Sequence, residues 1–223
     1  FARLAAARAR KPVWLIDADL PNQTQQTEIA RQPMPPEEAL AHVGAAIDAG
    51  FDAVEIPLNS PQWEKSIPAV VEAYGDKALI GAGTVLNAER VDQLARMGCR
   101  LIVTPNIQPE VIRRAVSYGM TVCPGCATAT EAFAALDAGA QALKVFPSSA
   151  FGPDYIKALK AVLPPEVPVF AVGGVTPENL AQWIKAGCTG AGLGSDLYRA
   201  GQSVERTQRQ AAAFVKAYRE AVQ

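Results

Sequence analysis

Asp137-Ala-Gly139-Ala-Gln-Ala-Leu-Lys144 is one copy of a pattern that recurs along this 223-residue chain. In each copy an amphipathic helix ends at Ala-Gly or a similar stop, one or two spacer residues follow, and a short apolar strand begins. The glycine can adopt the left-handed conformation that satisfies the last helical carbonyls and turns the chain into the next strand. Further copies end their helices at Gly50, Gly98, Gly119 and Gly187.

The pattern predicts a series of β then α units. The strand candidates lie roughly 20 to 27 residues apart, as consecutive βα units require. They centre on Glu55, Ile80, Val103, Val122, Lys144, Ala171 and Leu193. If Pro12-Val-Trp-Leu-Ile16 adds an eighth strand, the sheet can close, so we expect an α/β fold, a single-domain (β/α)8 TIM barrel with an atypical first strand. A doubly wound open sheet is the alternative, which the alternation alone does not exclude.

Composition limits the classes of partner. Hydrophobic residues make up 49% of the chain and the formal net charge is -1, which offers no field for nucleic acid or anionic membrane. No apolar stretch has membrane-spanning length. We therefore expect a cytoplasmic protein that binds small molecules or copies of itself. Residues 1–35 break the repeat pattern and are expected to be an atypical extension with an uncertain first strand, followed by the barrel domain over residues 36–223.

The cysteines and the histidine suggest no metal. Four cysteines and one histidine cannot supply two pairs of ligands at zinc-finger spacing. Cys123-Pro-Gly-Cys126 has the spacing of a redox motif or of half a zinc site, but no second pair accompanies it. His42 stands in a helical pattern, and we expect a helix-surface residue there rather than a catalytic base.

Two ionisable residues lie inside apolar strands. Lys144 stands in Ala142-Leu-Lys-Val-Phe-Pro147, where desolvation favours a neutral amine that can form a Schiff base with a ketone without a bound cofactor. Glu55 could supply acid-base chemistry from across the barrel. The alternatives are an edge lysine whose stem lies on apolar surface and a buried Lys144–Glu55 ion pair that only fixes packing.

Small residues end the last two strands. Gly173-Gly174 and Gly194-Ser195 stand where barrels commonly bind phosphate through backbone N–H groups. Either pair alone could be an ordinary tight turn, but together they favour a phosphate site. Residues 190–195 are rich in glycine yet lack the spacing and the downstream acidic residue of a dinucleotide site, so we expect no NAD.

Six motifs, in this order along about residues 34–223, resemble the KDPG/KHG aldolase family of class I aldolases. They are Glu55-Ile-Pro-Leu-Asn59-Ser60, Gly81-Ala-Gly-Thr84-Val85, Thr104-Pro-Asn-Ile107, Cys123-Pro-Gly-Cys-Ala-Thr128, Leu143-Lys-Val-Phe-Pro147 and Ala171-Val-Gly-Gly-Val175. Asn59 stands where the gluconate enzymes usually carry arginine, which favours the galactonate branch of the family.

The resemblance implies a homotrimeric lyase without metal or cofactor. Its substrate would be a phosphorylated sugar acid, 2-dehydro-3-deoxy-6-phospho-D-galactonate, which it would cleave to pyruvate and D-glyceraldehyde 3-phosphate in galactonate catabolism. By the same resemblance, Lys144 forms the imine at C2 and Glu55 relays protons, directly or through a water. The implied substrate-binding residues are Thr84 and Pro105 at the pyruvate, Phe146 beside the imine, and Gly173, Gly174, Gly194 and Ser195 at the phosphate.

One position departs from the family. The family ends its first strand with an arginine that binds substrate, and counting back from Pro36 places Gln32 there, with Arg31 beside it. Three alternatives to the galactonate enzyme stay open. They are a KDPG/KHG aldolase of the same family, a sugar-phosphate epimerase or isomerase that uses Glu55 without a lysine adduct, and a catalytically silent trimeric scaffold or phosphate-ligand binder.

Overall fold

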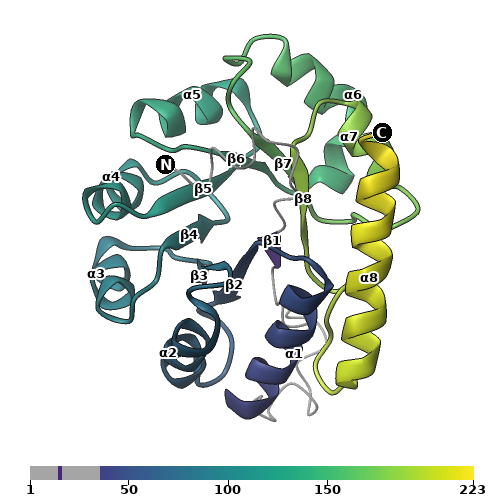
Figure 1. Ribbon diagram of the computed structural model, residues 1–223. Helices are drawn as coiled ribbons and strands as arrows, with labels where there is room; N and C mark the ends of the chain where they lie inside the picture. The colour runs from purple at the N-terminus through teal and green to yellow at the C-terminus, as the bar shows by residue number, and fades with distance from the viewer. Residues whose placement is uncertain (1–14, 17–35) are drawn as a thin grey trace, which may run out of the picture.

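The computed structural model describes residues 15–16 and 36–223, in which short strands alternate with helices (Figure 1). The strands are β1 (Leu15–Ile16), β2 (Ala53–Pro57), β3 (Leu79–Gly83), β4 (Leu101–Thr104), β5 (Thr121–Cys126), β6 (Leu143–Val145), β7 (Val169–Val172) and β8 (Gly190–Leu193). The helices are α1 (Pro36–Ala49), α2 (Trp63–Tyr74), α3 (Ala88–Arg96), α4 (Pro109–Ser117), α5 (Ala129–Asp137), α6 (Ser148–Lys160), α7 (Leu180–Lys185) and α8 (Val204–Ala221).

The strands form one curled parallel sheet in the order β1-β8-β7-β6-β5-β4-β3-β2, with the helices around its outer face (Figure 1). This order never reverses as a doubly wound sheet requires, so that alternative is wrong. β1 pairs with β8 through Leu15 opposite Gly192 and Ile16 opposite Leu193, and β1 is also a spatial neighbour of β2. The ladders of the described strands end at β1 and β2. A curled α/β sheet is therefore established, whereas the closed (β/α)8 barrel is not confirmed.

The predicted helix stops are confirmed. The repeat glycines all have a positive φ, which is 103° at Gly139, as left-handed helix ends require. At the start of α5, the Glu131 amide donates to the Thr128 hydroxyl while the Thr128 amide donates to the Glu131 carboxylate. This reciprocal capping box fixes the first turn of α5. Local signals therefore account for the alternation of helices and strands.

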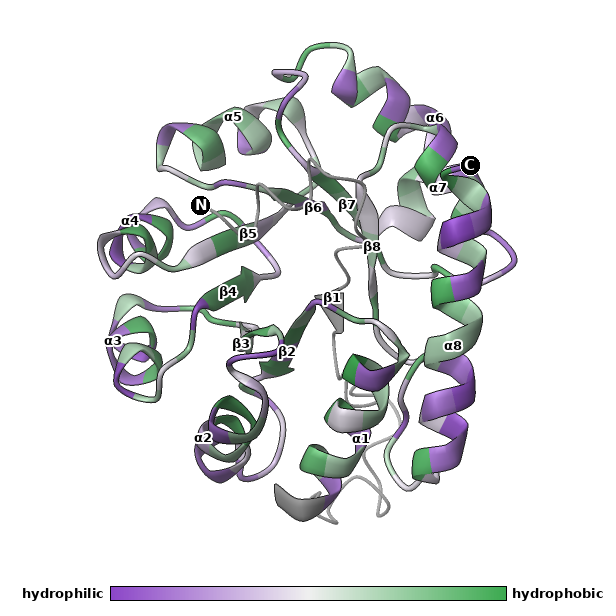
Figure 2. Ribbon diagram, viewed as in Figure 1, coloured by the Kyte–Doolittle hydropathy of each residue, from purple (hydrophilic) through white to green (hydrophobic). Residues whose placement is uncertain are grey.

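Two apolar layers cover the two faces of the sheet. The outer layer lies between strands and helices and contains Leu143 and Val145. The inner layer consists of Ala53, Leu101, Val103, Cys123, Ala142, Phe170 and Val172. Figure 2 shows apolar strands at the centre and polar residues on the outward faces of the helices. Within residues 36–223, no helix is long and apolar enough to cross a bilayer.

Of residues 1–35, the structure describes only β1. Of the expected strand Pro12–Ile16, Leu15 and Ile16 form β1 beside β8. Gln32, the predicted counterpart of the family's arginine, lies outside the described residues, as does nearly all of the predicted extension at residues 1–35.

Candidate active site

Lys144 is the central residue of β6 and points to the inner face of the sheet. Leu143 and Val145 on either side pack in the outer layer, and alternation along a strand sends the residue between them inwards. Lys144 lies opposite Gly125 of β5 and is only 4% exposed. Its Nζ lies 4.7 Å from the centroid of the Phe146 ring. The alternative of an edge lysine with its head in water is therefore wrong.

Glu55 enters the same interior from β2. Its neighbours Val54 and Ile56 pack in the outer layer, so Glu55 faces inwards, where it is 1% exposed. The carboxyl group lies against Gly83 at the end of β3, and a Cβ added to Gly83 would overlap both carboxyl oxygens. Gly83 therefore leaves the space in which the Glu55 carboxyl sits.

The buried thiol of Cys123 lies within the electrostatic influence of both charged residues. Burial raises the pKa of Cys123 to about 12; the charge of Lys144 opposes this rise, while Cys126 and Glu55 add to it. Cys123 belongs to the inner layer and Cys126 to the outer layer, because residues three apart in a strand face opposite sides. Both are free thiols. The two thiols of the Cys-Pro-Gly-Cys segment therefore lie on opposite faces of the sheet.

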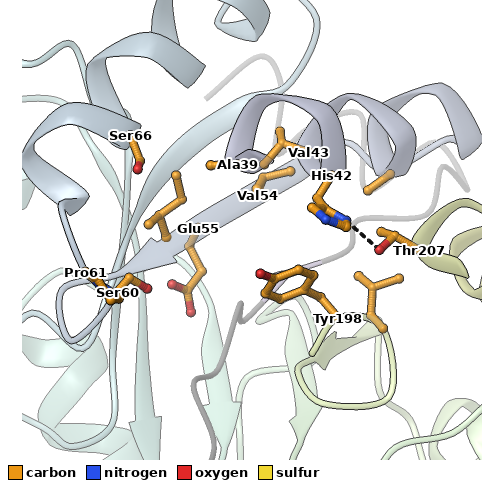
Figure 3. Close-up of a pocket in the computed structure, with 13 residues that line it drawn as sticks. Ala39, His42, Val43, Val54, Glu55, Ser60, Pro61, Ser66, Tyr198 and Thr207 are labelled. Atoms are coloured by element: carbon orange, nitrogen blue, oxygen red, sulfur yellow. Dashed lines mark hydrogen bonds between the residues drawn. The ribbon is translucent and has the colours of Figure 1, made fainter. Parts of the chain in front are cut away.

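A cavity of about 50 Å³ opens beside Glu55, between β2, α1 and the loop that follows β8. Its lining is mostly apolar, and Glu55 and Tyr198 enter it from opposite sides (Figure 3). This volume has room for a few water molecules.

His42 also lines this cavity, and the expectation of a helix-surface histidine is wrong. His42 is 8% exposed, its Nδ1 lies 2.7 Å from Thr207 Oγ1 (Figure 3), and its ring meets Tyr198 edge to face. Burial lowers the pKa of His42, while the charges of Glu38 and Glu205 oppose that shift. The hydrogen bond between His42 and Thr207 joins α1 to α8.

Thr84 and Pro105 follow β3 and β4 directly, and both are half-buried. Thr84 has a φ of 54°, which is uncommon for a β-branched residue. Such strain is concentrated at functional sites. After β4, the Thr104 hydroxyl donates to the Asn106 carbonyl at 2.6 Å and so closes the turn around Pro105. The carboxyl ends of these parallel strands share one edge of the sheet with those of β2 and β6.

The two predicted phosphate loops lie at the same edge, after β7 and β8. Gly173 and Gly174 have φ values of 94° and 76°, and the Gly173 carbonyl accepts a hydrogen bond from the Ser149 amide at 3.1 Å. The Gly194 carbonyl accepts a hydrogen bond from the Leu197 amide at 2.9 Å, which closes a turn that contains Ser195. The first loop therefore lies beside the start of α6.

Two contributors to this region have no role assigned from the sequence, although Ser148 stands among the strand-end residues that follow Lys144. Ser148, at the start of α6, is fully buried and bonds to the backbone of β6 and β7. Tyr198 lines the cavity opposite Glu55. The motif containing Lys144 runs directly into Ser148 in the sequence, but no local pattern shows what its hydroxyl contacts.

Comparison with known proteins identifies the family. Residues 33–212 match the family described as KDPG and KHG aldolase. The chain belongs to this aldolase family. The 2-dehydro-3-deoxy-6-phosphogalactonate aldolase of Escherichia coli (strain K12) is 87% identical over 188 residues, which cover 84% of this aldolase and 92% of that relative.

Solved structures agree with this assignment. A native KDPGal structure superposes with a TM-score of 0.86 at 77% identity and covers 95% of both chains. A cube-shaped protein cage designed by fusing symmetric oligomeric domains matches with the same TM-score of 0.86 at 76% identity, over 96% of this chain and 74% of that chain. Membership of the family makes this protein an enzyme of the aldolase class, a carbon–carbon lyase.

Proposed function

We propose that this aldolase cleaves 2-dehydro-3-deoxy-6-phosphogalactonate to pyruvate and D-glyceraldehyde 3-phosphate through a Schiff base on Lys144. The observation that carries the proposal is the burial of the Lys144 amine on the inner face of the sheet, which Glu55 shares. The galactonate substrate is supported by the 87% identity to the enzyme named for it. Asn59, exposed two residues beyond the end of β2, supports the same branch of the family.

The proposed reaction uses only groups of this chain and the substrate. The Lys144 amine attacks C2, and loss of the ketone oxygen as water, with a proton supplied by Glu55, gives the protonated imine and leaves Glu55 as a carboxylate. Glu55, directly or through a water, takes the proton of the C4 hydroxyl. The C3–C4 bond then breaks, its electron pair moves toward the imine to form an enamine, and C4 leaves as the aldehyde. Protonation at C3 and hydrolysis release pyruvate and restore the amine.

The remaining binding roles are proposed from position. Thr84 and Pro105, at the ends of neighbouring strands, would line the pyruvate part of the site. Phe146 would pack beside the imine, since its ring already lies 4.7 Å from the Lys144 Nζ. Backbone N–H groups of the two loops after β7 and β8 would hold the phosphate; these loops contain Gly173, Gly174, Gly194 and Ser195. Gln32 is proposed at the family's arginine position.

We also propose that the sheet closes as a (β/α)8 barrel between β1 and β2, and that three copies of the chain assemble. The neighbouring positions of β1 and β2 support closure. Phe133 on α5 and Phe151 on α6 are 42% and 38% exposed, and exposed aromatic side chains are enriched at interfaces. Light scattering should give the mass of three chains, and the mass of a single chain would contradict assembly.

Two comparisons test the proposed activity. Turnover of the galactonate and gluconate forms of the phosphorylated acid should favour the galactonate form, and equal rates would overturn that choice of substrate. Lys144→Ala should abolish cleavage because no imine can form at residue 144. Lys157→Ala, which removes an exposed lysine of α6, is the matched control and should keep full activity. Abundant cleavage by Lys144→Ala would contradict the Schiff-base mechanism.

A further inference from the structure

The pairing of β6 with β7 stops before β7 ends, and a serine hydroxyl supplies the hydrogen-bond partner that the β6 backbone no longer provides. The last registered pair between β6 and β7 is Val145 with Ala171, although β7 continues to Val172. Ser148 Oγ accepts a hydrogen bond from the Val172 amide at 3.0 Å and donates one to the Val145 carbonyl at 2.7 Å. Ser148 is 0% exposed, so it satisfies two backbone groups in a place that water does not reach.

These two backbone groups flank the two halves of the proposed site. Val145 directly follows Lys144, the amine that would hold C2 of the substrate. Val172 directly precedes Gly173, the first residue of a proposed phosphate loop. The Ser148 hydroxyl is therefore a two-bond link between the strand end that carries the amine and the strand end that carries the phosphate loop.

Further contacts limit how this corner can move. The Phe146 amide donates to the Cys126 carbonyl at 3.1 Å, which ties the exit of β6 to β5. The Ser149 amide donates to the Gly173 carbonyl at 3.1 Å, and a Cβ on Gly174 would lie 2.7 Å from Ser149 Cβ. The phosphate loop therefore contacts Ser149, the residue after Ser148, so a shift of Ser149 would displace the loop.

The geometry points to Ser148 as a positioning residue that fixes the Lys144 amine relative to the phosphate loop after β7. This inference rests on the proposed function, since only a phosphorylated keto acid needs both sites at once. Ser148 itself is fully buried and acts through Val145 and Val172 rather than by touching substrate. Pyruvate alone requires the amine but not the phosphate loop.

Ser148→Ala should therefore separate two activities. The variant leaves the Val172 amide and the Val145 carbonyl without their partner, so the corner between β6 and β7 relaxes. A displacement on the order of 1 Å between reacting groups lowers rates roughly 100-fold. We expect kcat/KM for the phosphorylated acid to fall roughly 10- to 100-fold, mainly through kcat, because the bound substrate is held out of line. The rate of borohydride trapping with pyruvate should change less than about twofold.

Two further variants complete the experiment. Ser148→Cys keeps a side chain of similar size whose sulfur is a weak hydrogen-bonding group. It should therefore give an intermediate loss of kcat/KM, and it provides a folded variant if Ser148→Ala does not fold. Tyr74→Phe removes another hydroxyl that donates to a backbone carbonyl, in this case from the end of α2 to Leu40 in α1. These two helices lie away from β6. This control should leave turnover and trapping unchanged.

The positioning role has its own structural readout. Native-state hydrogen exchange by NMR should show faster exchange of the Val172 amide in Ser148→Ala. Retained protection of that amide would overturn the inference, as would equal losses of trapping and turnover, or unchanged kcat/KM. Absence of turnover in the unaltered enzyme would instead overturn the proposed function, and the amide measurement would still decide whether Ser148 links the two strands.

Discussion

Gly83→Ala should inactivate the enzyme by displacing a carboxyl group on another strand. Gly83 ends β3, and its φ is not in the left-handed region, so its backbone accepts an alanine. The added Cβ would overlap the carboxyl carbon and both oxygens of Glu55. The main effect of this substitution is therefore a shift of the Glu55 carboxyl, with Lys144 left in place.

The size of the effect follows from the overlap. Side-chain Cβ atoms essentially never approach another heavy atom closer than 3.0 Å, so the carboxyl must move by about 1 Å or more. Such a displacement costs roughly 100-fold in rate, and complete loss of acid-base catalysis costs up to about 10⁴-fold. The expected loss of 10² to 10⁴ corresponds to about 3 to 5 kcal/mol at the transition state.

Proton exchange into pyruvate measures this step without the aldol substrate. Interconversion of the pyruvate imine and its enamine replaces methyl protons by deuterium in D₂O, which ¹H NMR follows directly. Gly83→Ala should slow this exchange by the factor given above. Far-ultraviolet circular dichroism at the assay temperature checks that the variant is folded.

A double-mutant cycle assigns the loss to Glu55. In a Glu55→Gln background the carboxylate is already absent, so adding Gly83→Ala should cost less than about threefold more. Fully additive losses would refute the reasoning, because Gly83 would then act on something other than Glu55. Exchange by Gly83→Ala within about threefold of the unaltered enzyme would refute it as well.

Three other perturbations give distinct expectations. Because burial lowers the pKa of His42, the unfolded chain binds its proton more readily, so the free energy of unfolding should fall as pH drops below about 6.5; urea titrations should show a flatter pH dependence for His42→Gln, and identical slopes would contradict this. Thr84→Asn should relieve a positive φ and raise Tm by about 2 to 4 °C while lowering kcat/KM, and a lower Tm would count against strain at this position. Burial raises the pKa of every cysteine to about 12, so Ellman's reagent at pH 8 should label none in the native enzyme and four after denaturation, and rapid native labelling would contradict that burial; these thiols are Cys99, Cys123, Cys126 and Cys188.

The strand and helix alternation was predictable because its signals are local. Each strand candidate from Glu55 to Leu193 lies in one of the strands β2 to β8, since the glycine that stops each helix and the apolar run behind it are adjacent in sequence. Lys144 stood out for the same reason, as a charge within an apolar run. Closure of the sheet depends on an amino-terminal strand with weak local signals, and this part of the fold stays a prediction.

The supporting contacts of the site were not predictable because their partners are distant in the chain. His42 looked like a helix-surface residue, yet its hydrogen-bond partner Thr207 is 165 residues away. Gly83 was part of a recognised motif, but the sequence does not show that the carboxyl of Glu55 fills its missing Cβ position. Ser148 differs from an ordinary helix-start serine only through the strands that it joins.

The Schiff base on Lys144 is the central claim, and borohydride reduction in the presence of pyruvate tests it most directly. Peptide mass analysis then locates the reduced adduct. We expect a single adduct on Lys144, formed at a rate that depends on pyruvate and lost in Lys144→Ala. A folded enzyme that cleaves its substrate and yields no adduct, or an adduct on another lysine, would contradict the account.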